Sequence, residues 1–559
     1  TYFSDLEIGT TRGADIKMPW ELGRLQHLPR MALCAVLSSE AAATLQREVR
    51  NQILDFIASN PPQFGANWGC PMDVGIRAAN LCLAVDLFEQ AGLPFDTQFH
   101  AVLCASLTDH GRHIASHLEW APEGRSNHYL SDLVGLVFLG AYLPPTEETL
   151  GWLAYGVVEM AAETLNQFHA DGGNYEGSVG YHRLSSELVT YAFALVLGLP
   201  GEVARRLRDL EEKPDRFALV PVAGGLGPRA AAILAEPGPE LVERLAAIAS
   251  FMDATAAPNG RMAQIGDTDS GRLFKLDVAL MPGVDDQDRP AEDELSVMSS
   301  LFALKALFPE EPSVAPGSSL SAAVVRAMCG DSSLAAAKDR ANTPSSDNRV
   351  TRNQDREGAP RAERLYRFEI PDAAVRDMTV EAFPEFGLWV WRTPRLHLTF
   401  RCAGHHRSDA PYGHTHDDNL ALTLWVDGEW RIEDPGTYVY TSFPELRNAY
   451  RKAAAHFVPR AREWDAVTFD PTYLFDCRQR VTARMMRADV DAAEAEMANG
   501  SAVIRRAIDW ADGLVVKDRA WGCSLDSDVP SRDGLRVGLG YGRLADTPQR
   551  FPGATEACA

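Results

Sequence analysis

Two histidines and two aspartates crowd into five consecutive positions of PYGHTHDDNLALTLWVDGEWRIEDPG, residues 411–436. Alternate residues of a β-strand share a face, so His414, His416 and Asp418 would lie on the face that continues through Leu420. These residues could be catalytic bases, or part of a tetrahedral metal site, for which a His-x-His pair supplies only some of the ligands. They could equally form a hydrogen-bonded polar entry to a buried strand.

A second candidate is RSNHYLSDLVGL, residues 125–136, where Asn127 and His128 precede an apolar helical pattern. Asn is a common helix N-cap. Taken alone, Asn127 could therefore cap this helix and leave His128 exposed in the first turn. A direct role of these two side chains in binding or catalysis needs support from other residues.

Two further segments combine glycines with reactive side chains. Glycines in DGGNYEGSVGYHRLSSEL, residues 171–188, would let the backbone approach a ligand closely. Tyr175 and Tyr181 in this segment could stack on sugars or transfer protons, or could be satisfied tyrosines of an irregular loop. In IGDTDSGRLF, Asp267 and Asp269 could bind a cation or could brace their own turn.

Two kinds of structure must position these candidates. From about residue 30 to 310, apolar residues recur at helical spacing with Gly and Pro between the segments, which predicts antiparallel helix pairs. Residues 331–363 are polar and poor in aromatics, which predicts a linker or a long exposed loop. After them the period becomes two, and Asp427-Gly428 fits a hairpin turn. The predicted order is a helical region followed by an antiparallel β-sandwich or barrel-like sheet.

The composition fits a globular protein of more than one domain. With 559 residues, of which 46% are apolar and 23% charged, the chain exceeds one ordinary hydrophobic core. A net charge of −23 argues against broad nucleic-acid binding, although a local basic cleft could still bind an anionic substrate. No apolar run predicts a membrane-spanning helix, and nine scattered cysteines favour free thiols over a disulfide framework or a zinc knuckle.

In their order and spacing, these stretches resemble the heparinase II/III family of polysaccharide lyases. Residues 15–28 resemble the family's early Pro-Trp-Glu and Arg segment, and residues 67–81 its Trp-x-x-x-Met helix entry. Five further stretches resemble segments of the family. They are the segments around Asn127 and Tyr181, the Gly-Asp-x-Asp turn, the His-x-His-x-Asp hairpin, and YRKAAAHFV at 450–458. Four residues depart from the family pattern: Tyr129, Asp132, Lys452 and Ala453.

The resemblance implies a fold and a reaction. The fold is an incomplete (α/α) toroid of helical hairpins over residues 1–320, a linker or exposed loop over 321–363, and an antiparallel β-sandwich over 364–559. The reaction is β-elimination on a uronate-containing polysaccharide, such as a glycosaminoglycan, alginate or a bacterial exopolysaccharide. The bond from O4 to the sugar breaks without addition of water and leaves a 4,5-unsaturated end.

The resemblance also implies roles for single residues. Asn127, assisted by His128, would neutralise the substrate carboxylate so that the weakly acidic C5 proton can leave. Tyr181 would protonate the leaving O4 and could also act as a base, and His414 would act as the base for one C5 epimer. The substrate-binding candidates are Trp68, Tyr175, Glu176, His182, Arg183 and Arg407. Arg24, Arg77 and Arg125 are further candidates for binding carboxylate or sulfate, and each of these arginines could equally be an ordinary surface ion-pair partner.

Some family members hold a structural zinc ion in the sandwich, and the matching residues are His416, Asp434 and His456. No organic cofactor is implied. A plain two-residue hairpin turn would pair Asp434 with Ala421, roughly 16 Å along the strand from His416 at about 3.3 Å per residue. Only a bulge or a strong bend could bring the three zinc ligands together.

Two other functions fit the same residues. A carbohydrate-binding or polysaccharide-assembly protein would keep the fold without turnover. A metal-dependent hydrolase would use His414, His416, Asp418 and Asp434, would need metal for turnover and would give saturated products. In a hydrolase, however, Asn127 would have no role. The release of an unsaturated sugar distinguishes a lyase from both alternatives.

The expected partner is an anionic polysaccharide, and we expect neither a nucleic-acid partner nor a membrane-spanning segment. The first residues, TYFSDLEIGTTRG, show no basic-then-apolar leader pattern. The implied substrate leads us to expect a periplasmic or secreted protein, with a cytoplasmic location left open. The sequence does not predict the oligomeric state.

Overall fold

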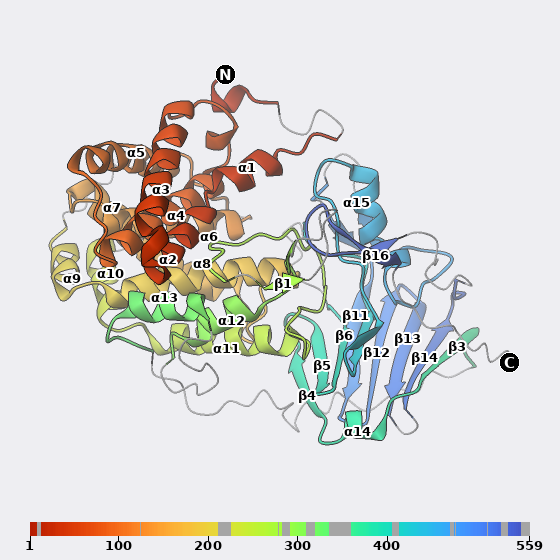
Figure 1. Cartoon of the computed structure of the whole chain (residues 1–559). Helices are drawn as coiled ribbons and strands as arrows, with labels where there is room; N and C mark the ends of the chain where they lie inside the picture. Colours follow the sequence, from red (N-terminus) through yellow and green to blue (C-terminus); the bar gives the residue numbers. More distant parts are fainter. Residues whose placement is uncertain are drawn as a thin grey trace.

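The computed structural model has a helical domain followed along the chain by a β domain, and the two lie side by side (Figure 1). The structure describes residues 1–7, 13–122, 124–210, 225–277, 279–281, 291–308, 319–334, 359–404, 413–469, 474–475, 477–510, 513–526 and 535–548. The helical segments and the strand segments follow the order that the sequence periodicity predicts.

The helical domain contains α1 to α13. Their bounds are α1 (Lys17–Gly23), α2 (His27–Leu37), α3 (Ser39–Ser59), α4 (Pro71–Gln90), α5 (Thr97–Ser116), α6 (Asn127–Tyr142), α7 (Glu147–Gln167), α8 (Val179–Gly198), α9 (Gly201–Arg208), α10 (Leu226–Ala235), α11 (Pro239–Thr255), α12 (Met298–Lys305) and α13 (Leu320–Cys329). Two short 3-10 helices, η1 (Phe3–Asp5) and η2 (Ala66–Trp68), accompany them.

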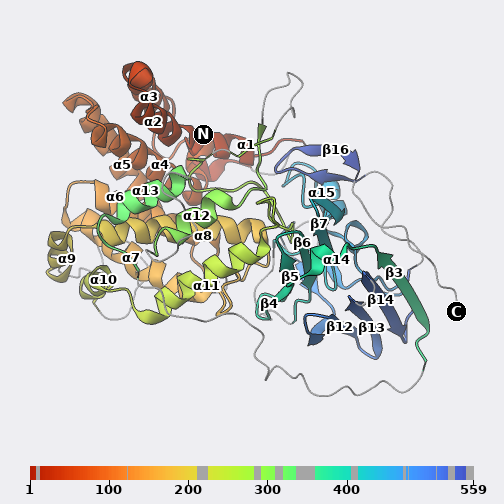
Figure 2. The ribbon, with the colours of Figure 1, turned by 60° about the horizontal axis from the view of Figure 1, so that its bottom comes forward.

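Helices α4, α6 and α8 form the centre of this domain. Their sequences are apolar on nearly all sides, which is typical of a helix surrounded by protein, and nearly all of their residues are buried. Gly75 lets α4 and α6 cross closely, because a Cβ there would lie 2.4 Å from the Ser131 carbonyl oxygen. Helix α5 packs on α4 and α6, α2 packs on α4, and α3 packs on α2, and together the helices form the predicted incomplete toroid (Figure 2).

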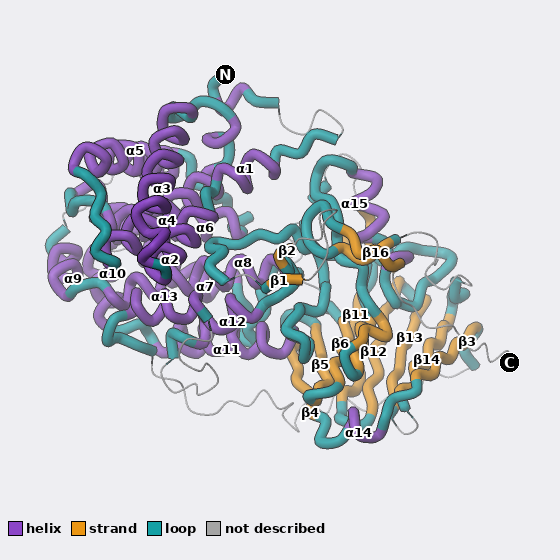
Figure 3. Tube along the Cα trace, in the orientation of Figure 1, coloured by secondary structure: helices purple, strands orange, loops and turns teal. Residues whose placement is uncertain are grey.

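Two five-stranded antiparallel sheets make up the β-sandwich (Figure 3). The first has the order β4 (Thr379–Phe383), β5 (Leu388–Thr393), β6 (Leu396–Arg401), β7 (Leu422–Val426) and β8 (Glu429–Ile432). The second has the order β11 (Thr482–Ala488), β12 (Ala492–Asn499), β13 (Ala502–Asp509), β14 (Leu514–Trp521) and β3 (Ala362–Phe368). One buried apolar cluster contains residues of both sheets, including Leu398, Leu424, Ile504 and Val516.

The remaining elements are short. Three two-stranded ribbons pair β1 (Leu280–Met281) with β2 (Ala291–Glu292), β9 (Val467–Phe469) with β10 (Cys477–Gln479), and β15 (Arg536–Gly538) with β16 (Leu544–Pro548). The helices of the β domain are α14 (Asp372–Val375), α15 (Pro444–Arg451) and the 3-10 helix η3 (Ala453–Ala455).

An apolar cluster joins the two domains. Phe251 and Met252 of α11 belong to it, together with Phe386, Leu388 and Val390 from the first sheet and the turn before it. The Phe251 and Phe386 rings meet with their centroids 4.6 Å apart. This cluster presses the edge of the first sheet against the end of α11 and fixes how the two domains face each other.

The structure confirms the predicted fold class and moves one boundary. Helix α13 lies inside the predicted linker, because Val324 and Val325 are apolar and pack in the core of the helical domain. Strand β3 begins at Ala362. The rest of the predicted linker, residues 335–358, lies outside the described residues.

No single helix of the described ranges is long and apolar enough to cross a membrane. Helices α8 and α9 satisfy these criteria only as a pair bent by 95°. All but the last residue of α8 are buried in the helical domain.

Candidate active site

Tyr181 lies in the first turn of α8 and donates its hydroxyl to a buried carboxylate. Ser178 caps this helix by accepting a hydrogen bond from the Tyr181 amide at 3.1 Å. The Tyr181 hydroxyl donates to Asp269 Oδ2 at 2.6 Å, and Lys17 Nζ donates to the same oxygen at 3.0 Å. Burial and the charge of Asp269 hold the pKa of Tyr181 well above its usual value, so the phenol is neutral.

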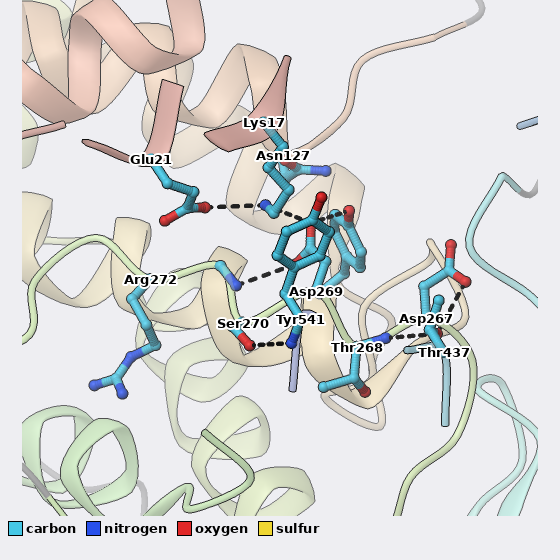
Figure 4. A network of polar contacts seen from close by, with 12 residues as sticks. Lys17, Glu21, Asn127, Asp267, Thr268, Asp269, Ser270, Arg272, Thr437 and Tyr541 are labelled. Atoms are coloured by element: carbon cyan, nitrogen blue, oxygen red, sulfur yellow. Dashed lines mark hydrogen bonds and ion pairs between the residues drawn. The ribbon is translucent and has the colours of Figure 1, made fainter. Parts of the chain in front are cut away.

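Lys17 balances the charge of Asp269 (Figure 4). Its ammonium group is buried and also bonds Glu21 at 2.9 Å. Burial alone would raise the pKa of Asp269, but the charge of Lys17 and the hydrogen bond from Tyr181 hold it below its usual value. Asp269 is therefore an ionised acceptor, although the cation that pairs with it comes from α1, 252 residues earlier.

The His414 imidazole stacks on the Tyr181 ring. The two ring centroids are 3.6 Å apart, and the ring planes differ by 17°. His414 Nδ1 lies 3.0 Å from Asp267 Oδ2, and its Nε2 lies 3.4 Å from Glu176 Oε2. A carboxylate that accepts from Nδ1–H leaves Nε2, which lies beside the Glu176 carboxylate, as the nitrogen that can accept a proton. The stack thus brings a neutral phenol into contact with an oriented imidazole.

Asp267 fixes both histidines of the His-x-His pair. Besides His414, it lies 3.0 Å from His416 Nε2, accepts from Thr437 Oγ1 at 3.2 Å and pairs with the Arg447 guanidinium. Burial would raise the pKa of Asp267, but the charge of Arg447 and the two histidine bonds hold it well below its usual value. An ionised carboxylate of the helical domain therefore anchors these two residues of the sandwich.

The segment around His414 is a loop, so the prediction of a shared strand face is wrong. Strand β7 begins only at Leu422, and Leu420 has a φ of +66°. The helical domain shapes this loop, since the Asp267 amide donates to the His414 carbonyl at 2.9 Å. Gly266, with a φ of +67°, permits this approach, because a Cβ there would lie 2.6 Å from the His414 carbonyl oxygen.

Asn127 is the first residue of α6, and its side chain does not cap the helix. Ser126 is the N-cap and accepts from the His128 amide at 3.3 Å. Asn127 Nδ2 donates to Glu176 Oε2 at 2.9 Å, and the Asn127 backbone amide donates to Oε1 at 2.9 Å. Asn127 Oδ1 is buried and has no hydrogen-bond partner within the described ranges. Because Glu176 also lies beside His414, it connects the amide to the imidazole.

The three predicted zinc ligands lie close together in the sandwich. The register shift in the β7–β8 hairpin pairs Leu424 with Ile432 and does not shorten the separation along the strand. The bend that the approach requires lies in the loop before β7, where Leu420 has a φ of +66°. Asp434 Oδ2 lies 2.6 Å from His456 Nδ1, and the His456 ring centroid lies 5.2 Å from that of His416. His416 Nδ1 and His456 Nε2 are buried without a hydrogen-bond partner among the residues that the structure describes.

Comparisons with known proteins give the family and the fold of the chain. The family description "Heparinase II/III N-terminus" matches residues 5–198, and "Heparinase II/III-like, C-terminal" matches residues 376–508. The chain belongs to the heparinase II/III family. A crystal structure of heparinase III has the same fold, with a TM-score of 0.51 and 14% identity over 88% of this chain and 61% of that chain.

The heparan sulfate lyase HepC from Pedobacter heparinus is also similar to this heparinase II/III chain. Its TM-score is 0.46, with 16% identity over 91% of this chain and 63% of that chain. The chain therefore spans less than two thirds of the length of these solved relatives. A search of curated proteins finds no match.

The substrate contacts that the heparinase II/III resemblance implies fall into two groups. Tyr175 is half-buried beside Glu176 and donates to the Arg125 carbonyl at 2.6 Å. Three others lie in the interior and are at most 1% exposed: Trp68, His182 and Arg183. Their side chains contact other parts of the protein: Trp68 packs on His110, His182 packs on Phe251, and Arg183 donates to the Glu294 carbonyl at 2.6 Å. Arg407 lies outside the described residues.

The other candidate arginines bind groups of the protein. Arg24 donates to Asp73 at 2.6 Å, and Arg77 donates to His110 Nε2 at 3.0 Å. Arg125 donates to Glu163 at 2.9 Å and is the most exposed of the three. Arg24 and Arg77 therefore support the interior of this heparinase II/III domain.

The sequence analysis missed the charged groups that hold the site together. Lys17 and Arg447 pair with Asp269 and Asp267, the two aspartates of the Gly-Asp-x-Asp turn. The turn itself was visible in the sequence, but nothing there indicated which side chains it binds. A buried carboxylate needs a cation, so two aspartates next to an apolar run were the available signal.

Proposed function

We propose that this chain is a polysaccharide lyase that cleaves a uronate-containing anionic polysaccharide by β-elimination. Membership of the heparinase II/III family supports lyase chemistry. The observation that carries the proposal is the Tyr181–His414 stack, in which a neutral phenol contacts an oriented imidazole at a centroid distance of 3.6 Å. A glycosaminoglycan is the first substrate to test, because the solved relative of the same fold is a heparinase III.

Elimination requires that the charge of the substrate carboxylate be neutralised. Asn127 and His128 at the start of α6 are the groups proposed for this task, with the Asn127 amide held by Glu176. A preorganised donor stabilises the enolate-like state without reorganising during the reaction. His128 Nδ1 is bonded to Glu119, which leaves its Nε2 as the second donor toward the substrate.

The stacked pair would take one proton from the substrate and return another to it. His414 Nε2 takes the proton from C5, the C4–O4 bond breaks as the C4–C5 double bond forms, and the Tyr181 hydroxyl gives its proton to O4. The raised pKa of Tyr181 fits the acid role, because a phenol that stays protonated can donate. The pair receives one proton and gives one, so no water is consumed.

The stack also favours one class of uronate. A sugar ring does not fit between two rings whose centroids are 3.6 Å apart, so acid and base approach the sugar from the same side. Such a pair favours a uronate in which the C5 hydrogen and O4 lie on one face, as in glucuronate and mannuronate. We expect faster cleavage of glucuronate polymers than of iduronate polymers, measured as kcat/KM on chains of one epimer. The opposite preference would contradict same-side elimination.

The family resemblance implies a structural zinc ion, and residues of the sandwich offer ligand atoms for it, although these atoms are farther apart than in a preformed site. The buried His416 Nδ1 and His456 Nε2 lack partners within the described ranges, and Asp434 lies beside them. Two imidazoles and a carboxylate are a suitable ligand set for zinc. We propose that His416, Asp434 and His456 would hold the ion. When bound, it would link the loop that carries His416 to the segment that follows α15.

The test mixes the protein with heparan sulfate, chondroitin sulfate, hyaluronan and alginate and follows the ultraviolet absorbance of the unsaturated uronate. We expect absorbance on at least one polymer. Tyr181→Phe should lower kcat/KM by about 10²- to 10⁴-fold, the range of a lost acid–base group. Tyr191→Phe is the matched control, because Tyr191 is a buried tyrosine of the same helix that packs against Phe274 away from the stack.

Two results would overturn the proposal. Binding of a polymer without any unsaturated product would favour a carbohydrate-binding protein. Saturated products that depend on added metal would favour a hydrolase. Equal losses in Tyr181→Phe and Tyr191→Phe would show that the hydroxyl of Tyr181 has no special role.

A further inference from the structure

A cysteine, a glutamate and a histidine converge in the helical domain, where α4 and α6 begin. Cys70 is the N-cap residue of α4, Glu119 follows α5, and His128 lies in the first turn of α6. Cys70 Sγ lies 3.7 Å from Glu119 Oε2 and 3.9 Å from His128 Nδ1. His128 Nδ1 lies 2.9 Å from Glu119 Oε1. One ligand atom from each residue thus lies within 4.8 Å of the other two.

These separations match one face of a tetrahedral metal site. With metal–ligand bonds of about 2.3 Å to sulfur and about 2.0–2.1 Å to nitrogen or oxygen, the ligand atoms of a tetrahedron lie roughly 3.4–3.6 Å apart. The two distances from the Cys70 sulfur are 3.7 and 3.9 Å. The shorter contact, 2.9 Å between Glu119 and His128, is a hydrogen bond that a metal ion would replace.

The charge around this cluster also favours a cation. Asp132 is fully buried, and its Oδ2 accepts from the Glu119 amide at 2.7 Å. Its Oδ1 has no hydrogen-bond partner in the part of the chain that the structure describes. Asp132 is also one of the departures from the family pattern. Burial raises the pKa of Asp132 well above its usual value and favours its neutral form, so Glu119 is the anion of this corner and faces a single histidine.

We propose that Cys70, Glu119 and His128 bind a zinc ion as three protein ligands. A thiolate in the set selects zinc over magnesium or calcium. The side chains of His128 and Glu119 are 35% and 28% exposed, which leaves a fourth position open to solvent. Binding would release the Cys70 thiol proton and the proton shared by His128 and Glu119.

The proposed ion would fix the entry to α6. His128 directly follows Asn127, so a metal on His128 Nδ1 would position the amide and leave His128 Nε2 as a donor. Cys70 and Glu119 would then be positioning residues. This site is separate from the proposed zinc site of the sandwich, whose ligands His416, Asp434 and His456 include no thiolate.

Cobalt titration of the full-length protein tests the proposal directly. After chelation of bound metals, Co²⁺ should produce a thiolate-to-cobalt charge-transfer band that saturates within two equivalents, because the sandwich site would also bind cobalt but without a thiolate band. Cys70→Ser should abolish this band and weaken cobalt binding at this site by more than about 100-fold, beyond the 10- to 100-fold effect of an outer-shell change. Cys34→Ser is the matched control, because Cys34 is an exposed free cysteine and its loss should leave the band intact.

Two further variants keep the proposal testable if Cys70→Ser does not fold. In the wild type, Glu119 Oε2 accepts from the Met72 amide at 2.9 Å. Glu119→Gln keeps an oxygen for this hydrogen bond but should still weaken cobalt binding. His128→Gln should shift the band. The proposal is overturned if no band forms, if the band survives Cys70→Ser, or if Glu119→Gln binds cobalt like the wild type. The metal is measured directly, so these outcomes do not depend on lyase activity.

Discussion

The candidate active site has two walls of different construction. The helical wall presents Asn127 and Tyr181 from the first turns of α6 and α8, where Ser126 and Ser178 cap regular helices. The sandwich wall presents His414 from an irregular loop before β7. One wall is positioned by local backbone structure and the other by side chains that are distant in the sequence.

This difference shows which residues determine the geometry of the site. Both walls are fastened to the turn that carries Asp267 and Asp269, which belongs to the helical domain. Asp269 holds the phenol of the helical wall, and Asp267 holds the imidazole of the sandwich wall. Loss of one aspartate should therefore damage one wall and leave the other in place.

The largest effect is expected from Asp267→Asn, which removes the charge that holds the sandwich wall. Arg447 would remain buried without its anionic partner, so the free energy of unfolding should fall by about 3–5 kcal/mol. The imidazole would lose its orientation, and kcat should fall by about 10³-fold or more. Urea unfolding and lyase kinetics measure the two losses. A variant with normal stability and kcat would show that Asp267 does not fix this wall.

The next largest effect is expected from Lys17→Met, which acts on the helical wall. Asp269 would lose its buried cation, so the free energy of unfolding should fall by about 3 kcal/mol at pH 7. Lys275→Met is the matched control, because Lys275 also pairs with two carboxylates but is more exposed, and its loss should cost less than about 1 kcal/mol. Equal losses in the two variants would contradict a special role of Lys17.

The ion pair of Lys17 and Asp269 should also make the free energy of unfolding depend on pH in acid. The pKa of folded Asp269 lies below its usual value, so its contribution to stability is fully present above the unfolded pKa of about 3.9 and is lost as pH falls toward the folded pKa. Below about pH 4, wild-type stability should therefore fall more steeply than that of Lys17→Met. Urea unfolding at a series of pH values measures the slopes, and parallel curves would contradict this assignment.

The smallest effects are expected from the helix caps. Ser126→Ala should cost about 1 kcal/mol, the usual loss of an N-cap bond. Ser178→Ala should cost more, because Ser178 is fully buried and its hydroxyl also donates to the Asp267 carbonyl at 2.5 Å. Thermal unfolding compares the two variants. A larger loss in Ser126→Ala would mean that the cap of α6 matters more than the junction with the turn.

Local pattern was sufficient to predict the elements but not the residues that cap the helices, since Ser126 and not Asn127 is the N-cap of α6. Alternation predicted β5 to β8, and apolar spacing before Asn127 and around Tyr181 predicted α6 and α8. The loop around His414 could not be predicted, because its shape depends on a contact between His414 and Asp267, 147 residues apart. Lys17 was missed for the same reason, since its partner lies 252 residues away.

Burial separates some of the predicted substrate-binding residues from the stacked pair. Trp68, His182 and Arg183 are the residue types that bind sugars, but side chains of neighbouring residues on a helix point in directions about 100° apart. His182 therefore turns into the core while Tyr181 faces the sandwich. A single sequence shows residue types but does not show which helix face meets the other domain.

The phenol and the imidazole come from different domains, yet they are in contact. The proposed reacting pair therefore forms only in molecules whose domains are docked, and the apolar cluster around Phe251 and Phe386 contributes to that docking together with the contacts of Asp267. The stability of this interface would therefore contribute to kcat. A substitution at Phe386 would lower kcat as undocking removes active molecules, although Phe386 never meets the sugar. On heating, activity would vanish before either domain loses its helices or strands.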